Sequence, residues 1–439
     1  MNRKNTLLVL LLACTVAVSA QTRGGYEIAI TEINYHPDSS WQSQDWIELY
    51  NYGASEIDIS GWYLKDESPV NEYIFPSGTI IQPGQYKVVA QRTDTFSMIY
   101  PSVTGVLGPF EYGLGNGGGL IRLLDDAGVP VIQIAYADTL PWPVAPDGFG
   151  PTLEVIDPTD NLNDPENWFG GCVGGSPGGP YEDCNYAIQV SEINYNSIFF
   201  HDSGDWIELV NSSAAPVDIS NWRIRDANDN NQYIIPEGTV LEPDAHLVLV
   251  QDLFQFFTYY SSMEPVIGDL VFGFSGQGDA LRIYDADLKL RYGLFYHDDP
   301  PWPDDADGNG YTLELVDFFG TPNVPGAWTS GCIYGSPTTA IQLPCPTSIE
   351  TYTALPFTVG PNPFSSYLLI DLSGIGFAQV AQALVYDISG RVVNSMIPAQ
   401  DQLVWDGNTS NGASLPAGLY MLQVQLTDGS YYAVQLIKE

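Results

Sequence analysis

Two pairs of glutamates have the residue type that acid–base chemistry requires. Glu32 and Glu48 form one pair, and Glu192 and Glu208 form the other. Two carboxyl groups on either side of a glycosidic bond could hydrolyse it. The second pair, however, repeats the first at a shift of 160 residues. An enzyme usually has one active site, whereas a residue that the fold requires recurs in every copy. We therefore expect both pairs to form structural hydrogen bonds.

The histidines indicate no clearer catalytic site. Nucleophilic catalysis needs a Ser or Cys beside a His. No histidine lies in a G-x-S-x-G or H-E-x-x-H context; the four are His36, His201, His246 and His297. We expect His36 and His201 to be exposed in the same loop of two related domains. The sequence therefore predicts that the chain is not an enzyme.

Calcium is the one cofactor for which the sequence offers a candidate site. Acidic, oxygen-rich loops suit this hard cation. Asp305, Asp307 and Asn309 occupy alternate positions, with Gly308 and Gly310 after the second and third. The bidentate glutamate of a typical calcium loop is absent. Two interpretations stay open, a calcium site and a solvated acidic turn.

Four cysteines follow the first twenty residues and indicate disulfide bonds. They are Cys172, Cys184, Cys332 and Cys345, and four cysteines allow three pairings. The repeat described below favours the local pairs Cys172–Cys184 and Cys332–Cys345. Zinc knuckles use narrower C-x2–4-C spacings, so a zinc site is the weaker alternative.

Charge and composition exclude several classes of protein. The chain of 439 residues has 14 Lys+Arg against 53 Asp+Glu, a formal charge of −39. Such a chain lacks the basic face that nucleic acids require, and an anionic membrane surface would repel it. Because 44% of the residues are hydrophobic, the chain can form real cores. The 43 Gly and 32 Pro predict many turns.

The first twenty residues are typical of a cleaved signal peptide. Arg3 and Lys4 precede an apolar stretch, and residues 18–20 are small enough for signal peptidase. Cys14 leaves a lipoprotein signal as an alternative. No later segment has the ~18 apolar residues of a membrane-spanning helix, so we expect no membrane span.

An internal repeat must position the candidate residues. The shift is 160 residues for E-I-N-Y (32–35 and 192–195), D-W-I-E-L (45–49 and 205–209), P-W-P (141–143 and 301–303) and G-S-P (175–177 and 335–337). This constant shift predicts two domains, residues 26–185 and 186–345. Trp142 and Trp302, each between two prolines, are either sugar-stacking platforms or core residues, and their repetition favours the core.

The local periodicity is that of short strands. Aliphatic residues alternate with others from Ile28 onward, and short β-branched or aliphatic runs occur at 86–90 and 246–250. Gly and Pro separate these runs at intervals typical of antiparallel sandwiches. We expect an all-β chain with one short helix over 93–100.

The repeated motifs carry a family resemblance. The order E-I-N-Y, D-W-I-E-L-x-N and D-I-S-x-W resembles the lamin-tail domain in both repeats. The resemblance implies an immunoglobulin-like β-sandwich for each repeat. It implies a binding or scaffolding role rather than a reaction.

Residues 346–355 form a predicted linker, after which the pattern changes. Residues 356–439 resemble the type A C-terminal sorting domain of the type IX secretion system. Five separated motifs carry this resemblance and contain Pro361, Asn362, Pro363, Asp387, Gly390, Arg391, Gly418, Tyr420 and Lys438. The resemblance implies a small C-terminal β-sandwich, recognition by the type IX secretion machinery, and export across the outer membrane of a Gram-negative bacterium.

The sequence thus predicts a secreted or cell-surface, non-catalytic protein for binding, adhesion or scaffolding. Its expected partners, besides the secretion machinery, are a surface polysaccharide or protein, and not nucleic acid. Two alternatives stay open. One is a structural spacer of the envelope without a small ligand, and the other is a carbohydrate-processing hydrolase.

Overall fold

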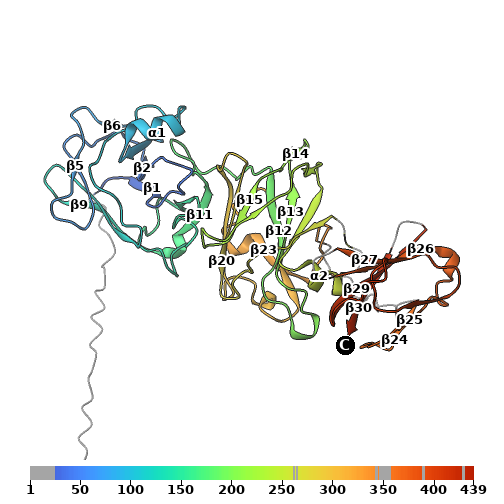
Figure 1. Cartoon of the computed structure of the whole chain (residues 1–439). Helices are drawn as coiled ribbons and strands as arrows, with labels where there is room; N and C mark the ends of the chain where they lie inside the picture. Colours follow the sequence, from blue (N-terminus) through green and yellow to red (C-terminus); the bar gives the residue numbers. More distant parts are fainter. Residues whose placement is uncertain are drawn as a thin grey trace, which may run out of the picture.

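Three all-β domains follow one another along the chain in the computed structural model (Figure 1). We call residues 26–185 repeat 1, residues 186–345 repeat 2 and residues 356–439 the C-terminal domain. The predicted signal peptide and linker lie outside the described residues, which are 25–260, 263, 265–341, 345, 357–387, 391–427 and 431–439. The all-β prediction is confirmed.

Repeat 1 is a sandwich of two antiparallel sheets. The first sheet has the order β11-β10-β1-β2-β7 and comprises Ile28–Asn34 (β1), Trp46–Asn51 (β2), Tyr86–Ala90 (β7), Pro151–Val155 (β10) and Trp168–Val173 (β11). The second has the order β5-β4-β8-β9 and comprises Tyr63–Lys65 (β4), Tyr73–Ile74 (β5), Gly119–Leu124 (β8) and Pro130–Tyr136 (β9). The strands Ile57–Asp58 (β3) and Ile80–Ile81 (β6) form a small separate pair.

The core of repeat 1 lies between its two sheets. Ile30 and Leu49 from the first sheet and Ile121 and Ile134 from the second belong to one cluster and are at most 1% exposed. Fully burying such a side chain stabilises the fold by roughly 1.5–3 kcal/mol. Since alternate residues of a strand face the same side, the alternation read from the sequence produces this core.

A helix covers the outer face of the first sheet. Helix α1 (Thr93–Ile99) buries Phe96. The Phe96 ring packs edge-on against Trp46 of β2, with ring centroids 5.6 Å apart. The helix predicted over 93–100 is therefore confirmed, and it covers the outer face of β2 and β7.

Repeat 2 has the same architecture at the 160-residue shift. Its first sheet, in the order β19-β18-β13-β12-β22-β23, comprises Ile188–Asn194 (β12), Trp206–Asn211 (β13), His246–Val250 (β18), Val266–Ile267 (β19), Tyr311–Leu315 (β22) and Trp328–Ile333 (β23). Its second sheet, in the order β16-β15-β20-β21, comprises Arg223–Arg225 (β15), Tyr233–Ile234 (β16), Asp279–Tyr284 (β20) and Leu290–Tyr296 (β21). A small pair and one helix complete it, Val217–Asp218 (β14), Val240–Leu241 (β17) and Leu253–Tyr259 (α2).

The C-terminal domain is a smaller sandwich. A three-stranded sheet of Thr358–Gly360 (β24), Leu368–Asp371 (β25) and Gln402–Trp405 (β28) accompanies a four-stranded sheet of Val380–Tyr386 (β26), Val392–Met396 (β27), Gly418–Leu426 (β29) and Tyr431–Lys438 (β30). The two sheets share one core that includes Leu368, Val385, Trp405 and Leu422.

The two repeats dock directly onto each other (Figure 1). Strand β11 of repeat 1 contacts β21 of repeat 2. Tyr284 donates its hydroxyl hydrogen to Asp38 Oδ2 at 2.7 Å. The Leu290 N–H donates to Ser40 Oγ at 2.9 Å, and Trp41 Nε1 donates to the Leu290 carbonyl at 3.3 Å. These bonds connect one loop of repeat 1 with one edge of repeat 2.

Glycines let the two surfaces approach. The Phe149 and Phe295 rings stack across the interface with centroids 5.9 Å apart. A Cβ at Gly293 would collide with the Phe149 carbonyl oxygen. The equivalent position in repeat 1 is Gln133, which is half-buried in β9. The strand itself therefore tolerates a side chain, and the close approach of repeat 1 is what requires glycine at 293.

Both predicted disulfides are present. Cys172–Cys184 and Cys332–Cys345 close loops of 12 and 13 residues. The first cysteine of each bond lies in the last strand of its repeat, Cys172 in β11 and Cys332 in β23. A disulfide that closes a loop of this size stabilises a fold by about 3 kcal/mol through the lost entropy of the unfolded chain.

Candidate functional site

Three glutamates lie side by side on the first sheet of each repeat. Glu32 on β1 faces Glu48 on β2 and Glu154 on β10 as direct cross-strand partners. In repeat 2 Glu192 faces Glu208 and Glu314 in the same way. Side chains of directly opposed residues have Cβ atoms about 4.5–5.5 Å apart, so three like-charged groups share one small area.

A β-bulge makes this arrangement possible. Neighbouring residues of a regular strand point to opposite faces. The register shifts between Ile30 and Glu32, and such a bulge reorients side chains. As a result the Thr31 hydroxyl donates to Glu48 Oε1 at 2.8 Å, while Glu32 lines the same cavity as Thr31 and Glu48. The register of repeat 2 shifts at the equivalent position, between Val190 and Glu192.

The loop after β11 donates hydrogen bonds to the glutamates of repeat 1. The Ser176 N–H donates to Glu32 Oε1 at 3.1 Å, and its hydroxyl donates to Glu154 Oε2 at 3.0 Å. The Gly178 N–H donates to Glu48 Oε2 at 2.6 Å. The predicted structural hydrogen bonding is confirmed, because the carboxylates hold the G-S-P segment against the sheet.

Repeat 2 forms the equivalent bonds, and one neighbour of its glutamates differs in chemistry. The Ser336 N–H donates to Glu192 Oε1 at 2.9 Å, and the Thr338 N–H donates to Glu208 Oε2. The difference lies on β18, where His246 replaces Tyr86 of repeat 1. The His246 Nδ1 atom lies 2.7 Å from Glu208 Oε1.

Burial makes the three carboxyl groups of repeat 1 weaker acids than usual. The side chains are between 1% and 3% exposed in both repeats. Burial, together with repulsion from Glu154, raises the pKa of Glu48 to about 8, and burial raises the pKa of Glu154 to about 7. Burial and the two flanking carboxylates raise the pKa of Glu32 well above its ordinary value. Removal from water disfavours the charged form of an acid, which explains the common direction.

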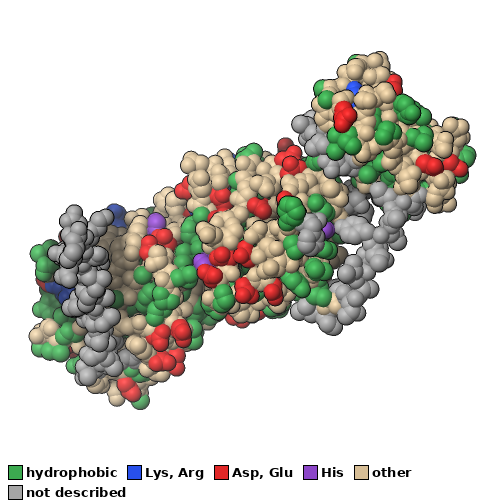
Figure 2. Space-filling view, turned by 90° about the horizontal axis from the view of Figure 1, so that it is seen from below, with side chains coloured by type: hydrophobic (Ala, Val, Ile, Leu, Met, Phe, Trp, Pro, Cys, Tyr) green, Lys and Arg blue, Asp and Glu red, His purple; other side chains and the backbone are tan. Residues whose placement is uncertain are grey.

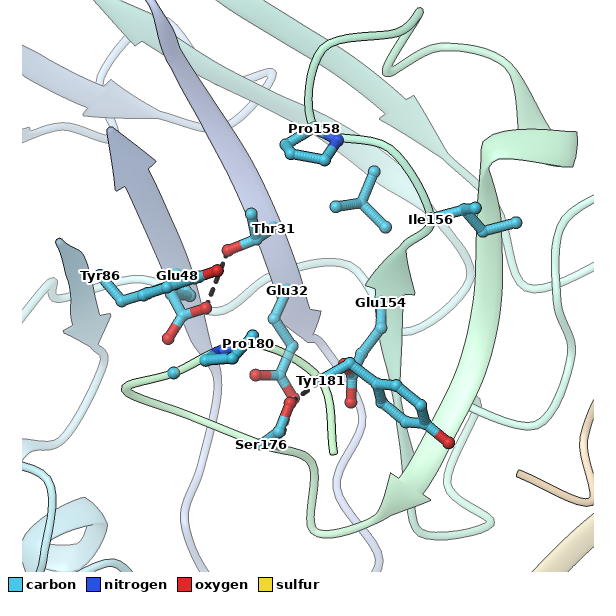
Figure 3. A pocket seen from close by; sticks show the side chains of 12 residues that line it. Thr31, Glu32, Glu48, Tyr86, Glu154, Ile156, Pro158, Ser176, Pro180 and Tyr181 are labelled. Atoms are coloured by element: carbon cyan, nitrogen blue, oxygen red, sulfur yellow. Dashed lines mark hydrogen bonds between the residues drawn. The ribbon is translucent and has the colours of Figure 1, made fainter. Parts of the chain in front are cut away.

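A cavity of about 240 Å³ lies over the cluster of repeat 1. Figure 3 shows the Glu32 side chain between those of Glu48 and Glu154, with Tyr86 and Tyr181 at the sides. The lining residues include the three carboxylates but no Lys, Arg or His. Oxygen atoms therefore dominate the polar lining of the cavity.

Sequence reasoning missed part of this site. Glu154 and Glu314 occur in the repeated T-L-E motif, but nothing in the local sequence places β10 beside β1. The presence of the same T-L-E motif in both repeats was the one signal that could have assigned these glutamates to the site. His246 was also missed, because its significance depends on a cross-strand neighbour.

The predicted calcium loop contains bonds that fix its own conformation. Asp305 is exposed in the 3-10 turn Asp304–Ala306. The Asn196 side chain donates to Asp307 Oδ1 at 2.5 Å, and the Asn309 side chain donates to the Asp307 carbonyl at 3.1 Å. Calcium binding at Asp305, Asp307 and Asn309 stays a prediction. A neighbouring group, His297, Asp298 and Asp299, also brings three ligand atoms within 4.8 Å of one another.

One expectation about the histidines is wrong. His201 is only 6% exposed, and its ring stacks on Tyr334 with centroids 3.9 Å apart. It replaces Trp41 of repeat 1, and Tyr334 replaces Gly174, where a Cβ would collide with the Trp41 ring. In repeat 2 the His201 and Tyr334 rings together occupy the position that the larger Trp41 ring occupies alone in repeat 1. His36 is part-exposed and lies 2.6 Å from Asp147.

The proline-flanked tryptophans belong to the cores. Trp142 and Trp302 are 7% and 8% exposed. Each ring lies beside a second tryptophan, Trp168 or Trp328, with centroids 6.1 and 6.4 Å apart. The prediction that repetition favours a core role is confirmed.

The C-terminal motif residues tie together the ends of their domain. Asn362 Oδ1 accepts a hydrogen bond from the Ile437 N–H at 2.7 Å. Lys438 is 8% exposed, and its Nζ donates to the carbonyls of Gly407 and Leu415.

Turns hold the remaining motif residues. Arg391 pairs with Asp387 at 2.8 Å, and the Tyr420 hydroxyl donates to the Pro416 carbonyl at 2.8 Å. Pro361 directly follows β24, Pro363 lies in the bend after it, and Gly418 begins β29; all three are exposed. Gly390 lies outside the described residues.

Acidic side chains are spread over the molecular surface. Figure 2 shows Asp and Glu across the face in view, with few Lys or Arg. Within the described residues, no helix is long and apolar enough to cross a membrane.

Comparison with known proteins shows the family to which this chain belongs. The model of the Lamin Tail Domain family matches residues 21–138 and 185–295, which together make up more than half of the chain. The chain belongs to this family and carries two copies of the domain. The model of the FlgD Ig-like domain matches residues 369–430. No curated protein matches the sequence.

Solved structures with detectable similarity include two proteins of Porphyromonas gingivalis. PorZ, described as an essential bacterial surface component of the type IX secretion system, is 12% identical, and the alignment covers 94% of this chain and 51% of PorZ. Dimeric latent PorU is 9% identical, with 94% and 34% covered. The chain thus spans about half of the first protein and a third of the second. Both TM-scores are 0.17, too low to establish a shared fold over the whole chain.

Proposed function

We propose that this chain is an exported, non-catalytic scaffold protein of the cell surface in which two lamin tail domains act as one rigid unit. The observation that carries this proposal is the docked interface between the repeats. The stacked Phe149 and Phe295 rings and the hydrogen bond from Tyr284 to Asp38 fix the orientation of the two domains. A rigid pair presents two surfaces at a constant spacing, which suits a scaffold.

Three features support export. The N-terminal pattern is typical of a signal peptide, the two disulfides suit an oxidising compartment, and the C-terminal motifs resemble a type IX sorting domain. In this proposal the secretion machinery reads the C-terminal domain and exports the chain across the outer membrane of a Gram-negative bacterium. Both lamin tail domains then remain outside the cell, free or attached to its surface.

Carbohydrate or matrix binding is the second candidate function, and one cavity favours it. A cavity of about 390 Å³ at the junction of the repeats is lined by residues that include Trp41, Trp222 and Arg291. In repeat 1 the residue equivalent to Trp222 is Trp62, which is buried with Tyr26 packed edge-on against it. In repeat 2 Trp222 is only partly buried. Aromatic rings beside polar groups are the usual means of holding a sugar ring.

Export is tested in a bacterium that has a type IX system. The full chain is compared with a chain that lacks residues 356–439, and whole cells are treated with an external protease. We expect the full chain to be cleaved at the surface or found in the medium, and the shortened chain to be retained inside and protected. The same host without its secretion machinery is the control. Surface exposure of the shortened chain would contradict the assignment of the C-terminal domain.

The scaffold role is tested with the exported protein itself. The purified protein is incubated with envelope extract and with a panel of polysaccharides, and what it retains is identified. Retention of defined envelope proteins supports a scaffold, whereas retention of one polysaccharide that depends on Trp222 supports carbohydrate binding. Retention of neither indicates a spacer. Turnover of a polysaccharide would contradict the non-catalytic proposal and indicate the hydrolase alternative.

A further inference from the structure

Among the described residues, no positively charged side chain lines the cavity of the buried glutamates of repeat 1. Glu32, Glu48 and Glu154 are at most 3% exposed, and the residues that line the cavity over them include no Lys, Arg or His. Buried charges normally require a counter-charge or a metal ion. The cluster must therefore either take up protons or bind a cation from solution.

One carboxylate oxygen at the centre of the cluster has no partner. Glu32 Oε2 is buried and makes no hydrogen bond. The equivalent atom of repeat 2, Glu192 Oε2, is in the same state, and among the described residues no other carboxylate oxygen shares it. Two copies of the fold thus leave the same acceptor unused, although Oε1 of each glutamate accepts bonds from the loop and a threonine. An unpaired acceptor at the same position of both repeats indicates a ligand that interacts with Oε2.

We propose that the cavity over Glu32, Glu48 and Glu154 binds one calcium ion, with Glu32 Oε2 as a ligand. The polar lining supplies carboxylate and hydroxyl oxygens, which hard cations prefer, whereas zinc prefers nitrogen and sulfur. Calcium accepts irregular sets of six to eight oxygens, whereas magnesium demands an octahedron. Ligands that arise from neighbouring strands and a covering loop suit the less demanding ion.

The hydrogen bonds place the ion between Glu32 and Glu48. The Thr152 hydroxyl lies 2.6 Å from Glu32 Oε1 and 3.4 Å from Glu154 Oε1. The Oε1 edge of Glu32 therefore faces Glu154, and Oε2 faces the side of Glu48 (Figure 3). The three glutamates do not bring one oxygen each within 4.8 Å of one another. We therefore assign Glu32 and Glu48 as direct ligands, with water completing the coordination and Glu154 adding negative charge nearby.

Repeat 2 provides an internal comparison. His246 lies 2.7 Å from Glu208 Oε1, at the position that Tyr86 occupies in repeat 1. Repeat 2 therefore has a basic side chain in contact with its glutamates, where repeat 1 has a neutral phenol. We therefore expect repeat 1 to bind calcium more tightly than repeat 2. The proposal stands whether or not the chain is a scaffold, because it rests on the cavity alone.

The test is isothermal titration of the chain from residue 21 to residue 439, freed of metal, with calcium chloride. We expect one dominant site with a dissociation constant on the order of 10⁻⁴ to 10⁻³ M, the range of extracellular calcium modules. Protons should be released on binding, because the buried carboxyl groups must ionise. Titration in two buffers of different ionisation enthalpy measures that release. Magnesium at the same concentrations should bind more weakly.

Variants locate the ion. Glu48→Gln should weaken calcium binding at least tenfold, and Asp305→Asn in the exposed acidic loop of repeat 2 should leave it unchanged. Tyr86→His should weaken binding without removing a ligand, and His246→Tyr should add a second site of similar strength. Circular dichroism verifies that each variant is folded, and Tyr86→His serves as the test if Glu48→Gln is not.

Two results would overturn the proposal. If the folded chain binds no calcium up to millimolar concentrations, protons alone neutralise the cluster. If Asp305→Asn abolishes binding and Glu48→Gln does not, the ion lies in the 304–310 loop instead. Sensitised terbium luminescence follows the ion independently, because Tyr86 and Tyr181 line the proposed cavity; loss of the signal in Glu48→Gln but not in Asp305→Asn distinguishes the two sites.

Discussion

Replacing Gly293 by alanine should separate the two lamin tail domains without unfolding either. An added Cβ at this position would lie 2.2 Å from the Phe149 carbonyl oxygen, and Cβ atoms essentially never approach other atoms closer than 3.0 Å. Repeat 1 would have to move away by at least 0.8 Å. The strand itself accepts the change, because Gln133 occupies the equivalent position of repeat 1.

This displacement is large enough to break the interface. The interdomain hydrogen bonds from Tyr284, Leu290 and Thr321 measure 2.7, 2.9 and 2.7 Å, so a shift of this size lengthens them to 3.5 Å or more. Each such bond stabilises by about 0.5–1.5 kcal/mol. The expected loss is therefore about 1.5–4.5 kcal/mol of coupling between the domains, with further loss from the Phe149–Phe295 stack.

Differential scanning calorimetry and small-angle X-ray scattering measure the effect. In the unchanged chain the two repeats should unfold together, whereas Gly293→Ala should give separate transitions and a larger radius of gyration. Gly326→Ala is the matched control in the same repeat, because a Cβ there meets nothing within 4 Å. If Gly293→Ala behaves like Gly326→Ala in both measurements, the repeats are not held by this interface and the rigid scaffold is refuted.

Three further predictions concern buried charges. The pKa values of about 8 for Glu48 and about 7 for Glu154 exceed the ordinary 4.5, so the folded chain holds extra protons. In the presence of a chelator, the free energy of unfolding should therefore fall as the pH rises from 4.5 to 8. Urea titrations should show a loss on the order of 1.4 kcal/mol per pKa unit. Burial lowers the pKa of His201 to about 4, so repeat 2 should lose stability as the pH falls from 6.5 to 4. The variant His201→Phe should not show this loss. If the pH dependence of stability is the same in the variant as in the unchanged chain, the prediction is wrong. Lys438→Met leaves the Leu415 carbonyl without its Nζ donor, while the Gly407 carbonyl keeps only the Leu415 N–H. The substitution should lower the stability of the C-terminal domain by about 1–3 kcal/mol, measured by calorimetry. A change in the transitions of the repeats instead would count against this prediction.

Much of the fold could be predicted because the sequence repeats itself. A constant shift of 160 residues places the same strand, turn and cysteine at the same point of both domains. The local disulfides follow from this, since Cys172 and Cys332 occupy equivalent positions. The core role of Trp142 and Trp302 follows for the same reason.

The remainder depends on neighbours that are distant in sequence. Glu154 joins Glu32 only because β10 pairs with β1 across about 120 residues, and no local pattern encodes that pairing. The burial of His201 depends on Tyr334, a residue contributed by a separate loop. We predicted an exposed position for His201 because the sequence around it does not indicate that the Tyr334 ring packs over it.

The interface between the repeats also limits how far such a chain can grow. A head-to-tail contact between like units can extend indefinitely and form fibres. Here the two units are no longer alike where they meet: repeat 2 has Ser330 where repeat 1 has Gly170, and repeat 1 has Gln133 where repeat 2 has Gly293. Repeat 2 therefore cannot bind another repeat through the surface that corresponds to Gly170 of repeat 1. Repeat 1 likewise cannot bind repeat 2 of another molecule through the surface that corresponds to Gly293. The assembly stops at two domains, which protects the protein from polymerising through its own duplicated surface.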